Sequence, residues 1–593
     1  MVICEKPTAA KLIARALGTK NFIELRPSRG ITLYDVVSEN NKHYVICSAC
    51  GHLYGLISSL CDKRIFPVYK LRWAPKQHKS GERVSIKKII KTISLMAKRA
   101  SEYIHACDYD VEGELIGYNI LQFACKNKYW ESRRAKFSSL TDSEIRKSFD
   151  DLLTPRSGLS SSGKARHYLD FIIGVNFSRA LSNCISNNCF KKLNNFSMGR
   201  VQSPTLAFVV DRETTIRQHV PDPYWNIIGT FQKDEISFKA PSQSKISNQS
   251  QAIETVKKSN NKKAFVDDVQ RSIKPLFPPH PFNTSTLQKE AYQLFKLSPS
   301  LTLSIAESLY LRGLISYPRT MSEQLPVLDY YHIISQLANF QKYRGIGVKL
   351  LSKNSLVPSQ GKLADETHPA IYPTGKSPTH INSMQSKIFD LITTRFIASF
   401  GETAELRYTK IYMSLLDLKF SVDSQELLSR GWTDIYFPYF QFPIFHLPNL
   451  QKNEMVNLVK IEYFEKFTKP PARFNQSTLL SKMETEGLGT NSTRADIIAT
   501  LIRRDYLSHN SSNNLEPTNL GFSIVNVLKK FVPLMFSSDL TRHFELQLKN
   551  LQLGKYDEKI FTNNAIKKVD NLICKFEDNK IAINHEIVNL LRI

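Results

Sequence analysis

The sequence predicts a multidomain protein in which an N-terminal α/β domain is followed by mostly helical and mostly β segments. The chain has 593 residues, which is too many for a single hydrophobic core. Over the first 150 residues, short apolar runs alternate with segments of helical spacing. Farther along, two long regions with helical spacing enclose a region of shorter, alternating apolar segments. These observations favour several domains of different classes in one chain.

Three short apolar runs in the N-terminal part are predicted to be strands of one sheet. They are residues 2–4, 44–49 and 103–107. Helical spacing follows the first run over 8–17 and the third over 112–125. Glu5 and Asp108 directly follow two of these runs, and ligands of α/β sheets gather at the carboxyl ends of strands. We therefore expect a functional site near these two acids.

The remaining segments are predicted from composition and periodicity. A Gly/Ser/Pro-rich stretch at 155–163 predicts a loop or boundary, and the polar stretch 242–263 predicts a loop or an exposed part of a small domain. Alternation predicts mostly β structure over 404–463. Helices are predicted over 165–185, 286–313 and 477–593, the last interrupted by an Asn/Ser loop at 509–514. We find no internal repeat.

The charge balance indicates a polyanionic partner. The chain has 80 Lys and Arg against 54 Asp and Glu, a net charge of +26. Nucleic acid is the first candidate partner and an anionic membrane surface the second. No apolar run approaches the roughly 18–20 residues that span a bilayer, and the N-terminus lacks the order of a signal peptide. We therefore expect a cytosolic or nuclear protein that does not contact membranes.

The cysteines are not arranged as a disulfide scaffold. There are nine in the whole chain, with one Cys-x-x-Cys pair, Cys47 and Cys50. This pair lies in an apolar run typical of a buried strand, and no second pair follows at zinc-site spacing. We expect these two cysteines to pack in the interior rather than to bind a metal.

An acidic cluster follows the third predicted strand. Asp108, Asp110 and Glu112 alternate along the chain, and Glu114 follows. Carboxylates this close together repel one another unless a cation lies among them, and hard oxygen ligands suit Mg²⁺. Glu5, at the end of another strand, is a candidate fourth ligand or general acid. The alternative is a solvated acidic turn that stabilises the start of the next helix.

A second candidate site is the segment Tyr317-Pro318-Arg319. A phenol has a pKa near 10 and is a weak nucleophile at neutral pH. A neighbouring guanidinium would lower that pKa and would also bind a phosphate through two hydrogen bonds. Pro318 restricts the backbone, so Tyr317 and Arg319 are expected to keep a set relation. Because the chain has 24 tyrosines and most tyrosines are structural, chemistry alone does not single out this one.

Both candidate sites resemble motifs of known families. Glu5-Lys6-Pro7 with the acidic cluster resembles the Toprim domain of topoisomerases, bacterial primases and some nucleases. The segment around Tyr317 is similar to the active-site motif of type IA DNA topoisomerases, and Lys6 directly after Glu5 resembles the archaeal topoisomerase I and topoisomerase III branch. Asp170, Gly174 and Arg179 in one predicted helix, and the segments 197–213, 367–374, 467–474 and 479–495, resemble further motifs of that family, in the family's order. The resemblance covers nearly the whole chain.

The resemblance implies a toroidal core of four domains. The implied domains are a Toprim domain at 1–145, a helical DNA-binding base at 146–213 and 470–593, a mostly β arch at 214–278 and 405–469, and a gate at 279–404 that carries the active-site tyrosine.

The resemblance also implies the reaction, which requires Mg²⁺ and no ATP. Tyr317 attacks a phosphate of one DNA strand, forms a 5′-phosphotyrosine, and the break is resealed after another strand has passed. Negative supercoils are relaxed, or linked DNA rings are separated. The implied catalytic residues are Tyr317, Arg319, Glu5, Lys6 and His368. The implied metal ligands are Glu5, Asp108, Asp110 and Glu112. The implied DNA contacts are Arg179, Arg200, Gln202, Ser203, Arg473, Thr493 and Arg494.

Two other classes of function remain open at this point. A Toprim primase or nuclease would account for the acids but not for Tyr317 and Arg319. A nucleic-acid scaffold without activity is the second alternative. A reverse gyrase is not expected, because the sequence has no Gly-x-x-x-x-Gly-Lys-Ser/Thr loop.

The resemblance implies a monomer, with a helicase or an OB-fold protein as possible partners. We expect it in the cytoplasm with the nucleoid in a prokaryote, and in the nucleus in a eukaryote. Cys574 is the only cysteine after Cys189, so we expect no C-terminal zinc ribbon of the kind that many relatives carry. The start only a few residues before Glu5 predicts a short first strand.

Overall fold

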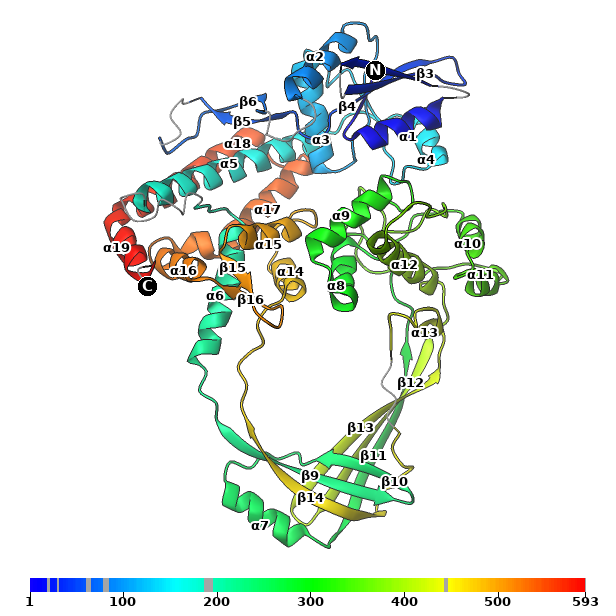
Figure 1. Cartoon of the computed structure of the whole chain (residues 1–593), viewed down its shortest axis with the longest axis vertical. Helices are drawn as coiled ribbons and strands as arrows, with labels where there is room; N and C mark the ends of the chain where they lie inside the picture. The colour runs from blue at the N-terminus through cyan, green and yellow to red at the C-terminus, as the bar shows by residue number, and fades with distance from the viewer. Residues whose placement is uncertain are drawn as a thin grey trace.

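The computed structural model describes residues 1–18, 22–28, 31–59, 65–77, 85–185, 196–441 and 446–591. In Figure 1 the described chain forms a ring, with the N-terminal sheet and the C-terminal helices at the top and a β-sheet at the bottom. Helices α8 to α12 occupy the right-hand side between them. Within these ranges no helix combines the length and the hydrophobicity needed to cross a membrane.

The N-terminal sheet contains the three predicted strands as direct neighbours. β1 (Val2–Cys4) pairs in parallel with both β4 (His43–Ser48) and β7 (Ile104–His105). Val2 and Cys4 pack toward helices α1 and α4, whereas Ile3 packs toward α2 and α3. Both faces are therefore buried, which explains why these runs are apolar throughout rather than alternating.

The sheet is completed by β2 (Ile23–Ser28), β3 (Ile31–Val37) and β8 (Arg133–Arg134). It is covered by α1 (Pro7–Leu17), α2 (Ile86–Ala97), α3 (Val111–Asn119) and α4 (Asp142–Asp150). A separate hairpin is formed by β5 (Tyr54–Ser58) and β6 (Leu71–Pro75).

The helical part joins two distant segments of the chain in one core. α5 (Ser157–Ile185) and α6 (Gln202–Gln218) pack with the C-terminal helices. The sequence predicts a loop or boundary at 155–163; the loop is wrong from Ser157 onward, because α5 begins there. Its glycines serve close packing: a Cβ on Gly158 would lie 2.2 Å from the carbonyl oxygen of Gln552. The C-terminal helices are α14 (Gln476–Thr485), α15 (Arg494–Arg503), α16 (Asn519–Phe531), α17 (Ser538–Gln552), α18 (Glu558–Asp578) and α19 (Lys580–Leu591).

The predicted Asn/Ser loop at 509–514 connects a short hairpin, β15 (Leu507–His509) and β16 (Leu515–Pro517). Cys189 and the last two residues of the predicted helical region, 592–593, lie outside the described residues.

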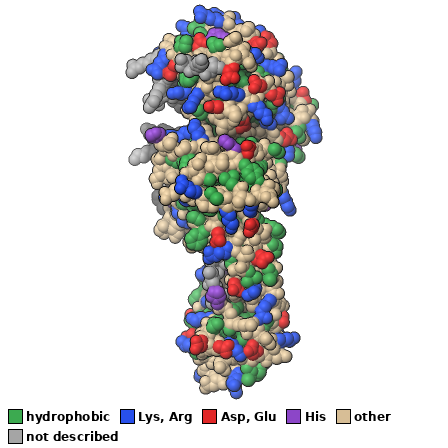
Figure 2. All heavy atoms as spheres, turned by 90° about the vertical axis from the view of Figure 1, so that its right-hand side faces the viewer, with side chains coloured by type: hydrophobic (Ala, Val, Ile, Leu, Met, Phe, Trp, Pro, Cys, Tyr) green, Lys and Arg blue, Asp and Glu red, His purple; other side chains and the backbone are tan. Residues whose placement is uncertain are grey.

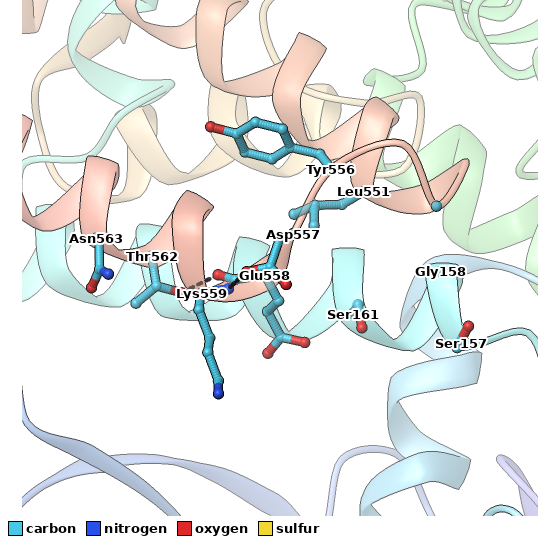
Figure 3. Close-up of a pocket in the computed structure, with 11 residues that line it drawn as sticks. Ser157, Gly158, Ser161, Leu551, Tyr556, Asp557, Glu558, Lys559, Thr562 and Asn563 are labelled. Atoms are coloured by element: carbon cyan, nitrogen blue, oxygen red, sulfur yellow. Dashed lines mark hydrogen bonds between the residues drawn. The ribbon is translucent and has the colours of Figure 1, made fainter.

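A hollow lies at the surface between α5 and α18. Figure 3 shows its lining, in which Asp557 accepts hydrogen bonds from the backbone nitrogens of Lys559 (2.8 Å) and Ile560 (3.0 Å). Glu558 Oε2 lies 2.8 Å from Lys164 Nζ. These acids cap α18 and bind it to α5, so the hollow is a packing feature of the helical part.

The lower part of the ring is a six-stranded antiparallel sheet in the order β10-β9-β14-β11-β12-β13. The mostly β prediction for 404–463 is confirmed, and the partner strands come from 223–276. The polar stretch at 242–263 is only partly a loop, because it contains α7 (Gln249–Ser259), which Asn248 caps and Ala252 anchors in the core. The strands are β9 (Pro223–Lys233), β10 (Ile236–Pro241), β11 (Lys263–Leu276), β12 (Ala404–Leu415), β13 (Leu418–Ser429) and β14 (Met455–Phe467).

The remaining side of the ring is helical and carries Tyr317. The helix predicted over 286–313 is two helices, because the backbone is left-handed at Lys296 and Ser298 caps a new start. The helices are α8 (Thr284–Phe295), α9 (Pro299–Tyr310), α10 (Tyr330–Ala338), α11 (Arg344–Leu351), α12 (Ser383–Ala398) and the short α13 (Trp432–Ile435).

A buried ion pair fixes the edge of the N-terminal sheet at which the acids lie. Arg134 Nε lies 2.9 Å from Glu114 Oε2, and the two side chains are 0% and 1% exposed. Arg134 also donates to the backbone oxygens of His105 and Asp108. Glu114, the last acid of the predicted cluster, is therefore a structural residue that positions the strand end.

Replacing Arg134 by Met should strongly destabilise the fold, because it removes the guanidinium that pairs with the buried Glu114 carboxylate and leaves that carboxylate with only the Tyr129 hydroxyl and the His105 ring as neighbours. We expect a loss of about 3–5 kcal/mol in the free energy of unfolding, measured by urea unfolding. Arg133→Met, at the exposed neighbouring position, is the control and should change stability by less than about 0.5 kcal/mol. Equal stability of the two variants would contradict the structural role.

Candidate active site

Glu5, Lys6 and Asp108 meet where β1 and β7 end. Parallel neighbours end at the same edge of a sheet, which brings residues about a hundred positions apart together. Lys6 Nζ lies 3.5 Å from Glu5 Oε1 and 3.7 Å from Asp108 Oδ2. Asp108 is buried, and its Oδ2 has no hydrogen-bond partner among the described residues.

Asp110 and Glu112 both lie at the start of α3 but make different contacts. Asp110 caps the helix by accepting a hydrogen bond from the backbone nitrogen of Gly113 (2.7 Å). Glu112 Oε2 instead lies 2.9 Å from His52 Nε2 and 3.0 Å from His167 Nε2. In this conformation the Glu112 carboxylate contacts two imidazoles. Among the described residues, the other acids of the acidic cluster are not part of this group of two histidines and one carboxylate.

Tyr317 reaches the acidic cluster from the neighbouring helical part of the ring that carries α8 to α12. Its hydroxyl donates a hydrogen bond of 2.6 Å to Asp110 Oδ2, and its ring centroid lies 4.4 Å from that of His368. Its backbone nitrogen donates to the carbonyl oxygen of Ser138 (2.7 Å). The side chain is 3% exposed, so this contact closes the ring over the candidate nucleophile.

The phenol of Tyr317 is not activated in the closed ring. Burial raises its pKa well above the ordinary value, and Asp110 and Asp108 raise it further, against a lowering by Arg319. The Arg319 guanidinium is itself paired with Glu307, whose Oε1 lies 2.6 Å from Nε and 2.5 Å from a terminal nitrogen. Arg319 thus lowers the phenol pKa, as predicted, but burial and the acids outweigh it, so the net pKa of Tyr317 is raised in the DNA-free chain.

Two buried carboxyl groups of the site, those of Glu5 and Asp108, have raised pKa values. Burial, followed by repulsion from Asp108, raises the pKa of Glu5 to about 8, although Lys6 acts in the opposite direction. Burial also raises the pKa of Asp108. Glu5 therefore carries a proton at neutral pH. Buried carboxylate oxygens, one of them without a hydrogen-bond partner, fit a divalent cation of the kind bound by oxygen ligands.

His368 has one ring nitrogen available beside Tyr317. Its Nδ1 lies 3.3 Å from the Ser138 hydroxyl, whereas Nε2 is buried with no partner in the part of the chain that the structure describes. Burial lowers its pKa to about 4, so the ring is neutral at neutral pH.

A groove of about 500 Å³ lies beside the acidic cluster. Among the predicted DNA contacts, Gln202, Thr493 and Arg200 line it, together with Glu112. The Arg200 side chain is only 1% exposed and pairs with Asp170 (2.9 Å) and Glu545 (2.7 Å).

Four predicted DNA contacts do not line this groove. Ser203 is buried in α6, and Arg494 donates to the backbone oxygens of 488 and 489. Arg473 pairs with Glu213 at 2.9 Å, and Arg179 donates to the carbonyl oxygen of residue 65 at 2.6 Å. The structure thus brings the catalytic candidates together, whereas the predicted DNA contacts are distributed over several elements.

Two protein-family models match this chain. The DNA topoisomerase model matches residues 154–563, which include the tyrosine segment, and the Toprim model matches residues 1–140. The chain belongs to the DNA topoisomerase family. It is a type IA topoisomerase, an isomerase that acts on DNA, so the match sets aside the alternative of a Toprim primase or nuclease.

Similar proteins span nearly the whole length of this topoisomerase. DNA topoisomerase 1 of Pyrococcus horikoshii is 36% identical over 100% of this chain and 86% of its own length. DNA topoisomerase 1 of Methanothermobacter thermautotrophicus is 36% identical over 99% of this chain and 80% of its own. The solved full-length topoisomerase I of Thermotoga maritima has the same fold, with a TM-score of 0.76 at 24% identity over 97% of this chain and 90% of that one.

Several residues of the topoisomerase site escaped prediction from the sequence. Glu307 lies on α9 three residues before Tyr310, whose hydroxyl donates to Asp108 Oδ1 at 3.4 Å. Residues three apart lie on one face of a helix, so helical periodicity could have placed Glu307 and Tyr310 together. Nothing in the sequence links His52 and His167 to the acids, since both meet Glu112 only through tertiary packing.

Proposed function

We propose that this topoisomerase cuts one DNA strand with Tyr317, passes another strand through the break and reseals it without ATP. The product is DNA with fewer negative supercoils, or separated DNA rings. The observation that carries the proposal is the 2.6 Å hydrogen bond from the Tyr317 hydroxyl to Asp110, which joins residues 207 positions apart.

The chemical step exchanges one phosphate ester for another. The Tyr317 oxygen bonds to phosphorus while the bond from phosphorus to the 3′ oxygen breaks, leaving a 5′-phosphotyrosine. Asp110 already accepts the phenol hydrogen bond and can receive the proton. Glu5, protonated at neutral pH because its pKa is about 8, can donate a proton to the departing 3′ oxygen. The covalent link conserves the ester energy, so resealing is the same step reversed.

Three side chains are proposed to stabilise the charge that develops on the phosphate. Lys6 lies among the acids, Arg319 follows the nucleophile, and His368 has a free ring nitrogen beside it. Preorganised donors of this kind lower the barrier because they need not reorient. Arg319 must exchange its partner Glu307 for the phosphate, which makes Glu307 a positioning residue.

We propose Mg²⁺ as the bound metal, held by Asp108 and Asp110, by Glu5 once it has given up its proton, and by Glu112 when it leaves the two histidines. When bound, the ion supplies positive charge that aligns the two DNA ends for resealing. The unpartnered Asp108 Oδ2 supports this assignment.

The ring must open for DNA to reach Tyr317. We propose that the four domains implied by the sequence move as units, and that the gate at 279–404 swings away from the Toprim domain at 1–145. The base at 146–213 and 470–593 would hold a single strand along the groove, and the arch at 214–278 and 405–469 would act as the hinge. We propose that Gln202 and Thr493 contact DNA directly, and that Arg179, Arg200, Ser203, Arg473 and Arg494 contact it or support the groove.

The partners, the oligomeric state and the cellular location of the enzyme are also proposals. Lys and Arg side chains are spread over the whole face in Figure 2, which suits contact with a polyanion at many points. Because one chain assembles the site, we propose a monomer, with a helicase or OB-fold protein as candidate partners. An enzyme acting on chromosomes would reside with the nucleoid in a prokaryotic cytoplasm or in a eukaryotic nucleus.

The direct test is incubation with negatively supercoiled plasmid and Mg²⁺ in the absence of ATP. We expect a ladder of topoisomers, no ladder when EDTA removes the metal, and protein attached to the 5′ end of the break after denaturation with detergent. If supercoiled plasmid is unchanged, linked rings with single-stranded regions are the second substrate. Nicked DNA without attached protein would indicate a nuclease, and no reaction on either substrate would contradict the proposal.

A further inference from the structure

Three metal-binding side chains meet beside the acidic cluster. His52 follows β4 after a left-handed turn at Cys50 and Gly51 (φ 57° and 94°), Glu112 lies in the first turn of α3, and His167 lies on α5. One ligand atom from each histidine and from the carboxylate lies within 4.8 Å of the others. The two imidazole centroids are 5.2 Å apart.

We propose that His52, Glu112 and His167 form a second divalent-cation site that binds Zn²⁺ and related imidazole-binding cations in preference to Mg²⁺. Mg²⁺ prefers oxygen ligands and an octahedral shell, whereas Zn²⁺, Co²⁺ and Ni²⁺ bind imidazole well. Two imidazoles with one carboxylate leave a position open, as is common for zinc with an exchangeable ligand.

The distances require only a small expansion. In a tetrahedral zinc site with bonds of about 2.0–2.1 Å, ligand atoms lie about 3.4 Å apart. Glu112 Oε2 lies 2.9 and 3.0 Å from the two Nε2 atoms, so these two separations must grow by a few tenths of an ångström, and the histidine ligand atoms, which lie within 4.8 Å of each other, must reach a similar spacing. The cation binds Nε2 of each neutral ring, so each ring keeps its one proton on Nδ1.

The surrounding charge suits a cation. Asp170 and Asp496 line the same groove as Glu112 and His167. The nearest arginines in the groove wall, Arg166 and Arg200, are already paired with Glu545.

The elements that carry the ligands are held close by packing. A Cβ on Gly163, one turn before His167, would lie 3.2 Å from both Leu115 Cβ and the carbonyl oxygen of Val111, so α5 and α3 are in close contact. The Trp73 ring lies 5.9 Å from the His167 ring. A cation at this site therefore ties the N-terminal sheet to α5 without rearranging either.

The second site competes with the first for Glu112. A cation bound to His52, Glu112 and His167 keeps that carboxylate away from Asp108 and Asp110, so the two sites cannot both use it. This consequence rests on the proposed function, in which Glu112 also serves Mg²⁺.

Cobalt provides a test that needs no DNA. The metal-free chain is titrated with Co²⁺, and the visible absorption of bound Co²⁺ is recorded. We expect one equivalent per chain, displaced by Zn²⁺ but not by a large excess of Mg²⁺, and without the near-ultraviolet band of a thiolate ligand. His52→Ala, His167→Ala and Glu112→Gln should each weaken Co²⁺ binding at least tenfold, and His509→Ala is the matched control.

The outcomes distinguish a failure of this metal site from a failure of the proposed topoisomerase reaction. Unchanged Co²⁺ binding in His52→Ala and His167→Ala would overturn the site, provided that circular dichroism shows both folded. If His52→Ala unfolds, His167→Gln and Glu112→Gln decide the question. Co²⁺ binding without plasmid relaxation would leave the site standing and contradict the proposed function. If filling the site with Zn²⁺ does not raise the Mg²⁺ concentration needed for relaxation, the inference that the two sites compete for Glu112 is wrong.

Discussion

Tyr317→Phe should abolish strand cleavage and leave the fold intact. The substitution removes only the hydroxyl, whose oxygen is the proposed nucleophile. Loss of a nucleophile lowers turnover by about 10⁴-fold or more. The measurements are the topoisomer ladder and the amount of protein attached to DNA after denaturation, both of which should fall to background.

DNA binding should survive this substitution. The Phe ring keeps its contacts with His368 and Tyr310, whose centroids lie 4.4 and 5.1 Å from that of Tyr317. Loss of the hydrogen bond to Asp110 removes about 1.5–3 kcal/mol of charge-assisted interaction across the closed ring. The ring should therefore open at least as readily, and binding to single-stranded DNA should stay equal or become tighter.

Tyr310→Phe is the matched control. Tyr310 is equally buried, and its hydroxyl donates to an acid of the same cluster, Asp108, at 3.4 Å. It lacks the proposed reacting role, so its loss should leave cleavage detectable and the 5′ attachment in place. Attachment that persists in Tyr317→Phe, or disappears equally in Tyr310→Phe, would refute the choice of nucleophile.

The local parts of this structure could be predicted from the sequence. Apolar runs at β1, β4 and β7 identified three neighbouring strands, and the acids after two of them identified the edge of the sheet where they meet. Periodicity identifies these elements because the buried face of a strand or helix determines which residues of a short stretch are apolar. Composition misled at 157–163, where glycine and serine lie in α5 and serve close helix packing rather than a loop.

The relations across the ring could not be predicted in this way. The bond from Tyr317 to Asp110 and the pairing of Arg319 with Glu307 depend on how separate elements dock. The phenol pKa followed from that docking, because burial among acids outweighs one guanidinium. Family resemblance named the tyrosine, but only the assembled chain shows that its resting state is closed.

Asp108→Asn combined with Asp110→Asn should remove metal-dependent activity and preserve the fold. Asn can still cap α3 and still accept the Tyr317 hydrogen bond, so the structural roles of Asp110 remain. The lost carboxylates are the proposed ligands of Mg²⁺, whose electrostatic contribution is several kcal/mol. Relaxation should therefore fall by about 10³-fold. Asp417→Asn, on the remote sheet, is the control.

The same double variant should be at least as stable as the wild type when no metal is present. Because the pKa of Asp108 is raised, mainly by burial, this group favours the folded state at low pH and disfavours it as pH rises above the ordinary value of 3.8. Asn does not ionise, so the variant does not lose stability in this way as the pH rises. Added Mg²⁺ should raise the unfolding temperature of the wild type but not of the variant, since only the wild type gains binding energy in the folded state. Normal relaxation by the variant at low Mg²⁺ would mean that the two acids serve structure alone.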